Sequence, residues 1–176
     1  MTDELPAVDD CGTHRDAMVR LALAMGWTKG VEVGVGAAYL SRALMEGVPS
    51  LELVGVDAGY RDDRRKLCKK VRNDYRDRYV FMRSDSVDAA PRIATRSCDF
   101  VFIDAGHSYR AVHDDIRAWR ERVKPSGWLL GHDYDHPDLP GVREAVDEWF
   151  GDRVRVLGHT IWAIPGRLIH GPETTP

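Results

Sequence analysis

Short runs of β-branched and aromatic residues alternate with helix-like segments along almost the whole chain. Apolar runs predict strands at 31–35, 51–56, 79–82, 98–103 and 128–130. Between them, helices are predicted at 13–25, 38–45, 62–75, 87–94, 109–123 and 140–150, in several of which apolar residues recur at helical spacing. Repeated strand–helix units favour a parallel sheet with helices on both faces.

The end of the chain departs from this alternation. Two β-rich runs at 154–157 and 160–164 are separated by Gly158 and His159, which predicts a hairpin. Residues 124–127 (Lys-Pro-Ser-Gly) are expected to form a turn. The sequence therefore predicts one α/β domain, Rossmann-like and doubly wound. Its mostly parallel, seven-stranded sheet ends in an antiparallel hairpin. The domain is expected at 13–168, with a flexible N-terminus at 1–12 and a flexible tail at 169–176.

Composition narrows the class of protein. A length of 176 residues suits one domain. The 30% of charged residues indicate a soluble, globular protein and not a membrane-bound one. The net charge of −3, without a long basic run, makes nucleic acid an unexpected partner. The acidic start resembles no signal peptide, and no stretch has the length of a membrane span. Cys11, Cys68 and Cys98 are widely spaced, which fits a reducing cytoplasm.

The predicted strand ends carry small and polar residues. In an open parallel sheet, ligands bind outside the carboxyl ends of the strands. Gly34 and Gly36 follow the first strand, where glycine allows backbone to approach a ligand closely. Asp57 ends the second strand, 21 residues past Gly36. A carboxylate there can accept both ribose hydroxyls of an adenosyl ligand.

Two cofactors with an adenosyl group, NAD and S-adenosylmethionine, could bind to such a glycine turn and carboxylate. The dinucleotide fingerprint needs a third small residue where this chain has Tyr39, which argues against NAD. Glu32, two residues before Gly34, favours S-adenosylmethionine.

The segment 32–36 (Glu-Val-Gly-Val-Gly) resembles the first motif of the class I methyltransferases. Segments 102–109 (Phe-Ile-Asp-Ala-Gly-His-Ser-Tyr), 124–134 and 140–142 resemble a small-molecule O-methyltransferase group. That group includes macrolide-sugar and catechol-type enzymes, many of them magnesium-dependent. The resemblance spans about residues 28–165.

The resemblance implies a role for each matching residue. Glu32, Gly34 and Gly36 would contact the methionine part of the cofactor, Asp57 the ribose, and Asp85 with Ser86 the adenine. Asp104 would face both the cofactor and a metal ion. His107 matches a general base, and Asp133 matches a metal ligand. His132 departs from the pattern, because the related magnesium enzymes have an acidic residue there.

Several alternatives stay open at this point. Asp104, His132 and Asp133 could bind magnesium through fewer protein ligands, bind another divalent ion that accepts nitrogen, or bind none. His107 could be the base, cap the following helix or bind substrate. We expect His14, His113, His159 and His170 at the surface. The expected acceptor is a hydroxyl of a sugar, natural product or phenol, and the expected assembly is a homodimer.

Three other functions compete with methyl transfer. An NAD-dependent oxidoreductase would use a Tyr–Lys pair, but no Lys stands four residues after Tyr109. A metal-dependent hydrolase could use Asp104, His107, His132 and Asp133, but it leaves the glycine turn unexplained. A non-catalytic module that binds an adenosyl ligand is the third.

Overall fold

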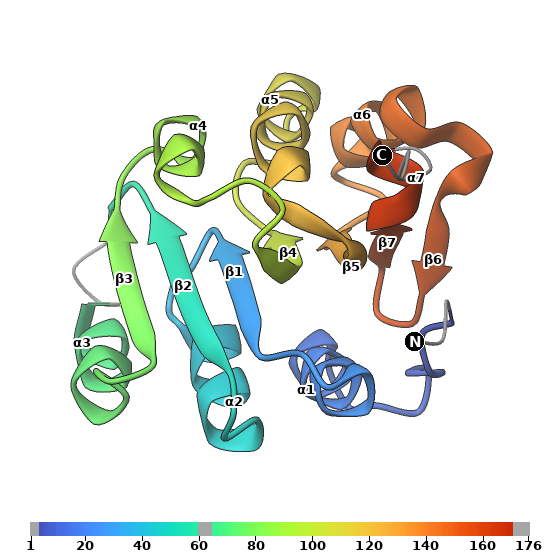
Figure 1. Cartoon of the computed structure of the whole chain (residues 1–176). Helices are drawn as coiled ribbons and strands as arrows, with labels where there is room; N and C mark the ends of the chain where they lie inside the picture. Colours follow the sequence, from blue (N-terminus) through green and yellow to red (C-terminus); the bar gives the residue numbers. More distant parts are fainter. Residues whose placement is uncertain (1–3, 60–64, 171–176) are drawn as a thin grey trace, which may run out of the picture.

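The structure, a computed structural model, describes residues 4–59 and 65–170 (Figure 1). The strands within them are β1 (Lys29–Val33), β2 (Glu52–Asp57), β3 (Tyr79–Arg83), β4 (Cys98–Ile103), β5 (Val123–Gly131), β6 (Arg155–Leu157) and β7 (Ile161–Pro165). The α-helices are α1 (His14–Met25), α2 (Tyr39–Gly47), α3 (Arg65–Asp74), α4 (Ser86–Ala89), α5 (Tyr109–Trp119), α6 (Pro140–Phe150) and α7 (Gly166–His170). The first residues of the helix predicted at 62–75 lie outside the described residues.

The described strands form one seven-stranded sheet in the order β3-β2-β1-β4-β5-β7-β6. β1 to β5 pair in parallel, whereas β7 is antiparallel to both β5 and β6. The predicted fold is confirmed. The strand order reverses between β1 and β4, and ligands of doubly wound sheets bind in the crevice at such a reversal.

Two apolar layers hold the sheet between helices. In β1, Val31 and Val33 pack in the cluster that includes α5 and α6, whereas Glu32 points to the other face. In β4, Phe100 and Phe102 pack in the cluster that includes α1, α2 and α3. Figure 1 shows the same division, with α1 to α3 below the sheet and α4 to α6 above it. Burial on both faces is why these strands are apolar throughout.

The turn predicted at 124–127 is wrong, because these residues belong to β5. Cys98 pairs with Val123 and Phe100 with Trp128, so the strand pairing shifts register between these two positions. The extra residues on β5 form a bulge. Gly127 lies there against the Asp99 carbonyl oxygen, 2.6 Å from where a Cβ would stand.

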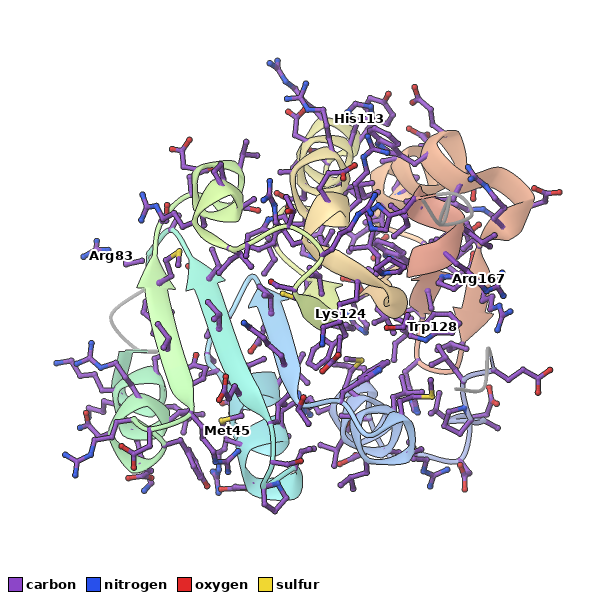
Figure 2. All side chains as sticks on the ribbon, viewed as in Figure 1. Met45, Arg83, His113, Lys124, Trp128 and Arg167 are labelled. Atoms are coloured by element: carbon purple, nitrogen blue, oxygen red, sulfur yellow. The ribbon has the colours of Figure 1, made fainter. Side chains whose placement is uncertain are left out.

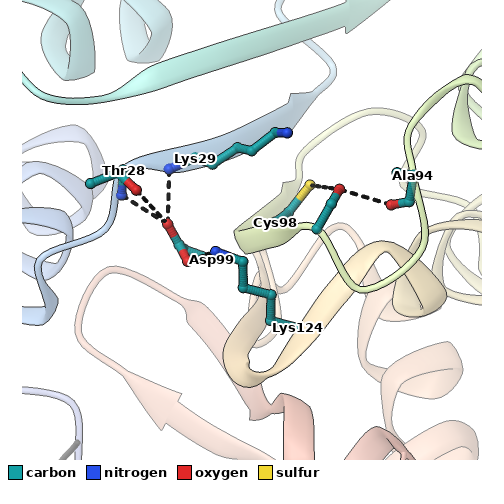
Figure 3. Close-up of polar contacts among 7 residues, drawn as sticks. Thr28, Lys29, Ala94, Cys98, Asp99 and Lys124 are labelled. Atoms are coloured by element: carbon teal, nitrogen blue, oxygen red, sulfur yellow. Dashed lines mark hydrogen bonds and ion pairs between the residues drawn. The ribbon is translucent and has the colours of Figure 1, made fainter.

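Asp99 ties together the amino ends of three strands (Figure 3). Its Oδ2 accepts from the Thr28 and Lys29 N–H groups, both at 2.9 Å, and Lys124 Nζ lies 2.6 Å from Oδ1. Burial raises the pKa of Asp99, but the Lys124 ammonium and the two N–H groups outweigh it and leave the pKa below its ordinary value. This charged cluster fixes the sheet edge opposite to the strand ends considered below.

Residues on both sides of the predicted domain also pack against it. Val8 is buried in the cluster under α1, and His170 ends α7 with Nε2 at 2.9 Å from the Val123 carbonyl oxygen. The His170 side chain is only 3% exposed, so its expected surface position is wrong. The boundaries 13 and 168 stay a prediction. No helix in 4–59 or 65–170 is long and apolar enough to span a membrane.

Candidate active site

A cavity of about 1090 Å³ opens beside the carboxyl ends of β1, β2 and β4. Its wall includes the turn after β1, the loop after β4, and the first turns of α1 and α2. Cavities of this size hold cofactors and small substrates. Eight of the predicted site residues line it: Glu32, Gly34, Gly36, Asp57, Asp85, Ser86, Asp104 and His107.

Gly34 lets the turn after β1 lie against the loop after β4. Its φ is +94°, a backbone conformation that residues other than glycine rarely adopt. A Cβ at this position would stand 2.1 Å from the Asp104 carbonyl oxygen and 2.7 Å from Ala105 Cα. A side chain would therefore disrupt the cavity wall.

Asp57 is held in place by the glycine turn. Its Oδ2 accepts from the Gly36 N–H at 2.8 Å, and its Oδ1 accepts from the Gly59 N–H at 2.9 Å. A carboxylate has about four acceptor positions. The two that remain can accept the paired hydroxyls of a ribose, as the sequence predicts.

Glu32 lies beneath α2 and is 2% exposed. The Ser41 hydroxyl donates to its carboxyl group and lies 3.0 Å from the Tyr79 hydroxyl. Burial raises the pKa of Glu32 to about 8, although the Ser41 hydrogen bond lowers it. The carboxyl is therefore largely protonated at neutral pH in the ligand-free protein.

Glu32→Gln is expected to remove a pH dependence of stability. The native pKa of about 8 lies above the ordinary 4.5, so the contribution of Glu32 is fully present below pH 4.5 and is lost as the pH rises to about 8. Across this window, the unfolding free energy of the wild type should fall relative to Glu32→Gln by up to about 1.4 kcal/mol per pH unit. Urea unfolding at several pH values measures this.

The matched control is Glu46→Gln. Glu46 lies at the surface of α2, where it forms an ion pair with Arg42 Nε at 2.7 Å. Its difference from the wild type should stay constant over the same pH window. A constant difference for Glu32→Gln as well would contradict the raised pKa of Glu32.

Asp85 and Ser86 start α4 at the end of β3. Asp85 accepts from the Val87 N–H at 3.0 Å. The Ser86 hydroxyl donates to Asp115 and accepts from Trp119 Nε1 at 2.9 Å, so its one proton is already bound. Burial raises the pKa of Asp115 to about 6. Sequence reasoning missed Asp115, which lines the cavity from α5.

Asp104, His107 and Asp133 come together at the ends of β4 and β5. One possible ligand atom from each lies within 4.8 Å of the others. His107 Nε2 is 3.0 Å from Asp133 Oδ2 and 3.7 Å from Asp104 Oδ1. The parallel pairing of Ile103 with Gly131 explains why these distant segments meet.

Two further histidines flank this cluster. His132 Nδ1 lies 3.1 Å from Asp133 Oδ1 and 3.9 Å from Asp104 Oδ1. The ring of His14, from the first turn of α1, lies 4.2 Å from the His132 ring. Burial and the neighbouring His132 lower the pKa of His14 to about 4. His14 lines the cavity, so its expected surface position is wrong.

His107 does not cap α5. The cap is Ser108, whose Oγ accepts from the Ala111 N–H at 3.3 Å. Asp104 raises the pKa of His107 above its ordinary value, aided by Asp133 and opposed by burial. Its imidazole therefore lies between two carboxylates, where it can hold a proton or share a metal ion with them.

Nearby aromatic residues pack away from the cluster. The hydroxyls of Tyr109 and Tyr134 donate to Glu148 and Asp147 of α6. His113 lies on α5 (Figure 2), with its ring 5.1 Å from the ring of Trp149. Tyr39 differs, because it is 60% exposed and lines the cavity.

The profile of a family described as a methyltransferase domain matches residues 29–134, more than half of the chain. The chain belongs to this family. The match contains the glycine turn, Asp57, Asp104, His107 and Asp133, so the methyltransferase resemblance is confirmed. No curated protein matches the sequence of this methyltransferase-family chain.

Solved structures share the fold of this methyltransferase at low sequence identity. An O-methyltransferase from Bacillus cereus, in complex with SAH (S-adenosylhomocysteine), is 19% identical, with a TM-score of 0.68 over 92% of this chain and 84% of that one. A protein from Corynebacterium glutamicum is also 19% identical, with a TM-score of 0.67 over 92% and 83%. A TDP-rhamnose 3′-O-methyltransferase of calicheamicin biosynthesis is 17% identical, with a TM-score of 0.66 over 86% and 76%.

Proposed function

We propose that this protein transfers a methyl group from S-adenosylmethionine to a hydroxyl of a small molecule. The observation that carries the proposal is a single cavity with two chemically different sides. The glycine turn and Asp57 form one side, which suits an adenosyl ligand. Asp104 and His107 form the other, which suits proton transfer.

The cofactor would supply a methyl group on a positively charged sulfur. In the proposed transfer, the acceptor oxygen would form a bond to the methyl carbon as the carbon–sulfur bond breaks, and a neutral thioether would leave. Most of the catalysis in such a displacement comes from alignment of donor and acceptor. The acceptor hydroxyl must also lose its proton, which the His107 imidazole would accept. Asp104 and Asp133 would stabilise the resulting imidazolium, because both carboxylates lie near its Nε2.

The donor set also fits a divalent cation. Asp104 and Asp133 offer the oxygen ligands that magnesium prefers, and His107 adds a nitrogen that manganese or zinc accepts more readily. A bound cation would orient the acceptor hydroxyl and favour its ionised form. His132, predicted as a ligand together with Asp104 and Asp133, lies beside Asp133 but outside the group of three residues that come together. His107 Nε2 cannot hold a cation and take a proton at once, so its two roles compete.

The proposed class of acceptor is based on the similarity of this fold to that of a solved structure. One neighbour in structure is named as a sugar-nucleotide O-methyltransferase, and we propose a sugar, phenol or related natural product here. A homodimer and a cytoplasmic location also stay proposals. A non-catalytic adenosyl-binding module would have the same cavity but show no turnover.

His107→Ala is expected to reduce turnover at least about tenfold, because a positioned base typically contributes that much or more. Binding of S-adenosylhomocysteine should stay close to that of the wild type. Transfer of labelled methyl from S-adenosylmethionine to a panel of nucleotide sugars and catechols measures turnover, and calorimetry measures binding. Assays with and without a chelator separate a base from a metal ligand.

His113→Ala is the matched control, since it removes an imidazole from α5 outside the cavity. It should leave turnover unchanged. Full activity of His107→Ala would refute its role. A wild type that binds S-adenosylhomocysteine but methylates nothing would favour the non-catalytic module.

A further inference from the structure

His14 is a half-buried imidazole that lines the cavity and lacks a hydrogen-bond partner. It lies in the first turn of α1, where Thr13 caps the helix by accepting from the Asp16 N–H at 3.3 Å. Its ring contacts that of His132, with 4.2 Å between the ring centres. No described residue hydrogen-bonds to either ring nitrogen of His14. Unpaired polar groups away from bulk water are rare in folded proteins, so this imidazole needs an explanation.

The two other imidazoles at this end of the cavity are already held by carboxylates. His107 Nε2 lies 3.0 Å from Asp133 Oδ2, and His132 Nδ1 lies 3.1 Å from Asp133 Oδ1. Asp104 Oδ1 adds a second carboxylate oxygen at 3.7 Å from His107 and 3.9 Å from His132. Of these three histidines, His14 is therefore the one with both nitrogens available to a ligand.

His14 and His107 come from segments that pack on opposite faces of the sheet. α1 packs in the apolar cluster below the sheet and α5, which follows His107, in the cluster above it (Figure 1). Among the described residues that line the cavity, His14 and His107 are the two histidines. The contact with His132 places His14 at the end of the cavity where methyl transfer is proposed. An acceptor held beside His107 would therefore have His14 within reach on its other side.

The imidazole of His14 is suited to an uncharged polar group. Burial and the neighbouring His132 lower its pKa to about 4, so that at neutral pH one ring nitrogen donates and the other accepts. A hydroxyl can pair with either nitrogen, whereas a phosphate or carboxylate can only accept. We propose that His14 hydrogen-bonds a second hydroxyl of the acceptor, next to the one that is methylated, and so selects acceptors with two hydroxyls. This inference rests on the proposed methyl transfer.

The test compares acceptors that differ by one hydroxyl. Each acceptor that the wild type methylates is paired with the analogue in which hydrogen replaces the neighbouring hydroxyl, as phenol does for catechol. His14→Ala should raise KM for the two-hydroxyl acceptor about 5- to 10-fold, as loss of one uncharged hydrogen bond does. KM for the one-hydroxyl analogue should change by less than about twofold, as should calorimetric binding of S-adenosylhomocysteine.

His14→Phe separates hydrogen bonding from packing. Phenylalanine keeps a ring against His132 but has no ring nitrogen, so KM should rise as it does in His14→Ala. His14→Gln keeps a donor and an acceptor and should return KM to within about threefold of the wild type. Wild-type KM values in His14→Phe would show that the ring only packs, and would overturn the inference.

His113→Phe is the matched control, because the His113 ring contacts those of Tyr109 and Trp149 outside the cavity. It should change neither KM. Equal increases for both members of a pair in His14→Ala, or no increase, would contradict the proposed contact. Weaker calorimetric binding of zinc to His14→Ala would make His14 a metal ligand instead and would also overturn the inference. If the wild type binds S-adenosylhomocysteine but methylates no acceptor, the proposed methyl transfer fails and the inference fails with it.

Discussion

Asp104→Asn is expected to lose at least about 100-fold in turnover while the protein stays folded. Loss of a charged group at the reaction centre typically has this size. Asp104 lies where cavity and cluster meet, with Oδ1 3.7 Å from His107 Nε2 and 3.9 Å from His132 Nδ1. Asparagine keeps the shape but removes the charge that would stabilise an imidazolium or a cation. The methyl-transfer assay measures turnover, and thermal unfolding checks the fold.

Asp88→Asn is the matched control for Asp104. Asp88 is an exposed carboxylate in α4 that does not line the cavity. Its replacement should leave turnover unchanged. Wild-type turnover in Asp104→Asn would contradict the assignment of the reaction to this end of the sheet.

Gly34→Ala is expected to destabilise the protein by roughly 3–5 kcal/mol and to abolish binding of S-adenosylhomocysteine. The new methyl group would meet the backbone of Asp104 and Ala105, which cannot rotate away as a side chain would. The φ of +94° adds strain at the same position. Urea unfolding measures the stability, and calorimetry measures the binding.

Gly26→Ala separates strain from overlap. Gly26 ends α1 with a φ of +64°, but nothing lies within 4 Å of where its Cβ would stand. Its replacement should cost only about 1 kcal/mol, from strain alone. Equal costs at the two glycines would show that close approach to the Asp104 loop is not what requires Gly34.

The fold could be predicted because its signal is local and repeated. Strands buried on both faces are apolar runs, and each helix shows its own periodicity, so the alternation leads directly to a parallel sheet. The bulge at 124–127 could not be predicted in this way. A Lys-Pro-Ser-Gly sequence is typical of a turn, and only the pairing of β5 with β4 keeps it in the sheet.

The site was predictable where residues follow strands and not where they begin helices. Asp57, Asp104 and Asp133 follow strand ends, and the topology brings those ends to one edge. His14 lies on α1, the helix that precedes β1, and no sequence motif marks it. A signal did exist, because a helix that leads into a strand of this sheet begins near the carboxyl edge. The place of Asp115 in the site could not be predicted, because it depends on the packing of α5 against α4, which no local sequence pattern specifies.

If the cavity holds an adenosyl methyl donor, calorimetric titration of the wild type with S-adenosylhomocysteine should detect binding of this product of the transfer. We predict saturable binding with a dissociation constant of about 100 μM or below, and no comparable binding of NAD. No binding of S-adenosylhomocysteine, or tighter binding of NAD, would contradict it.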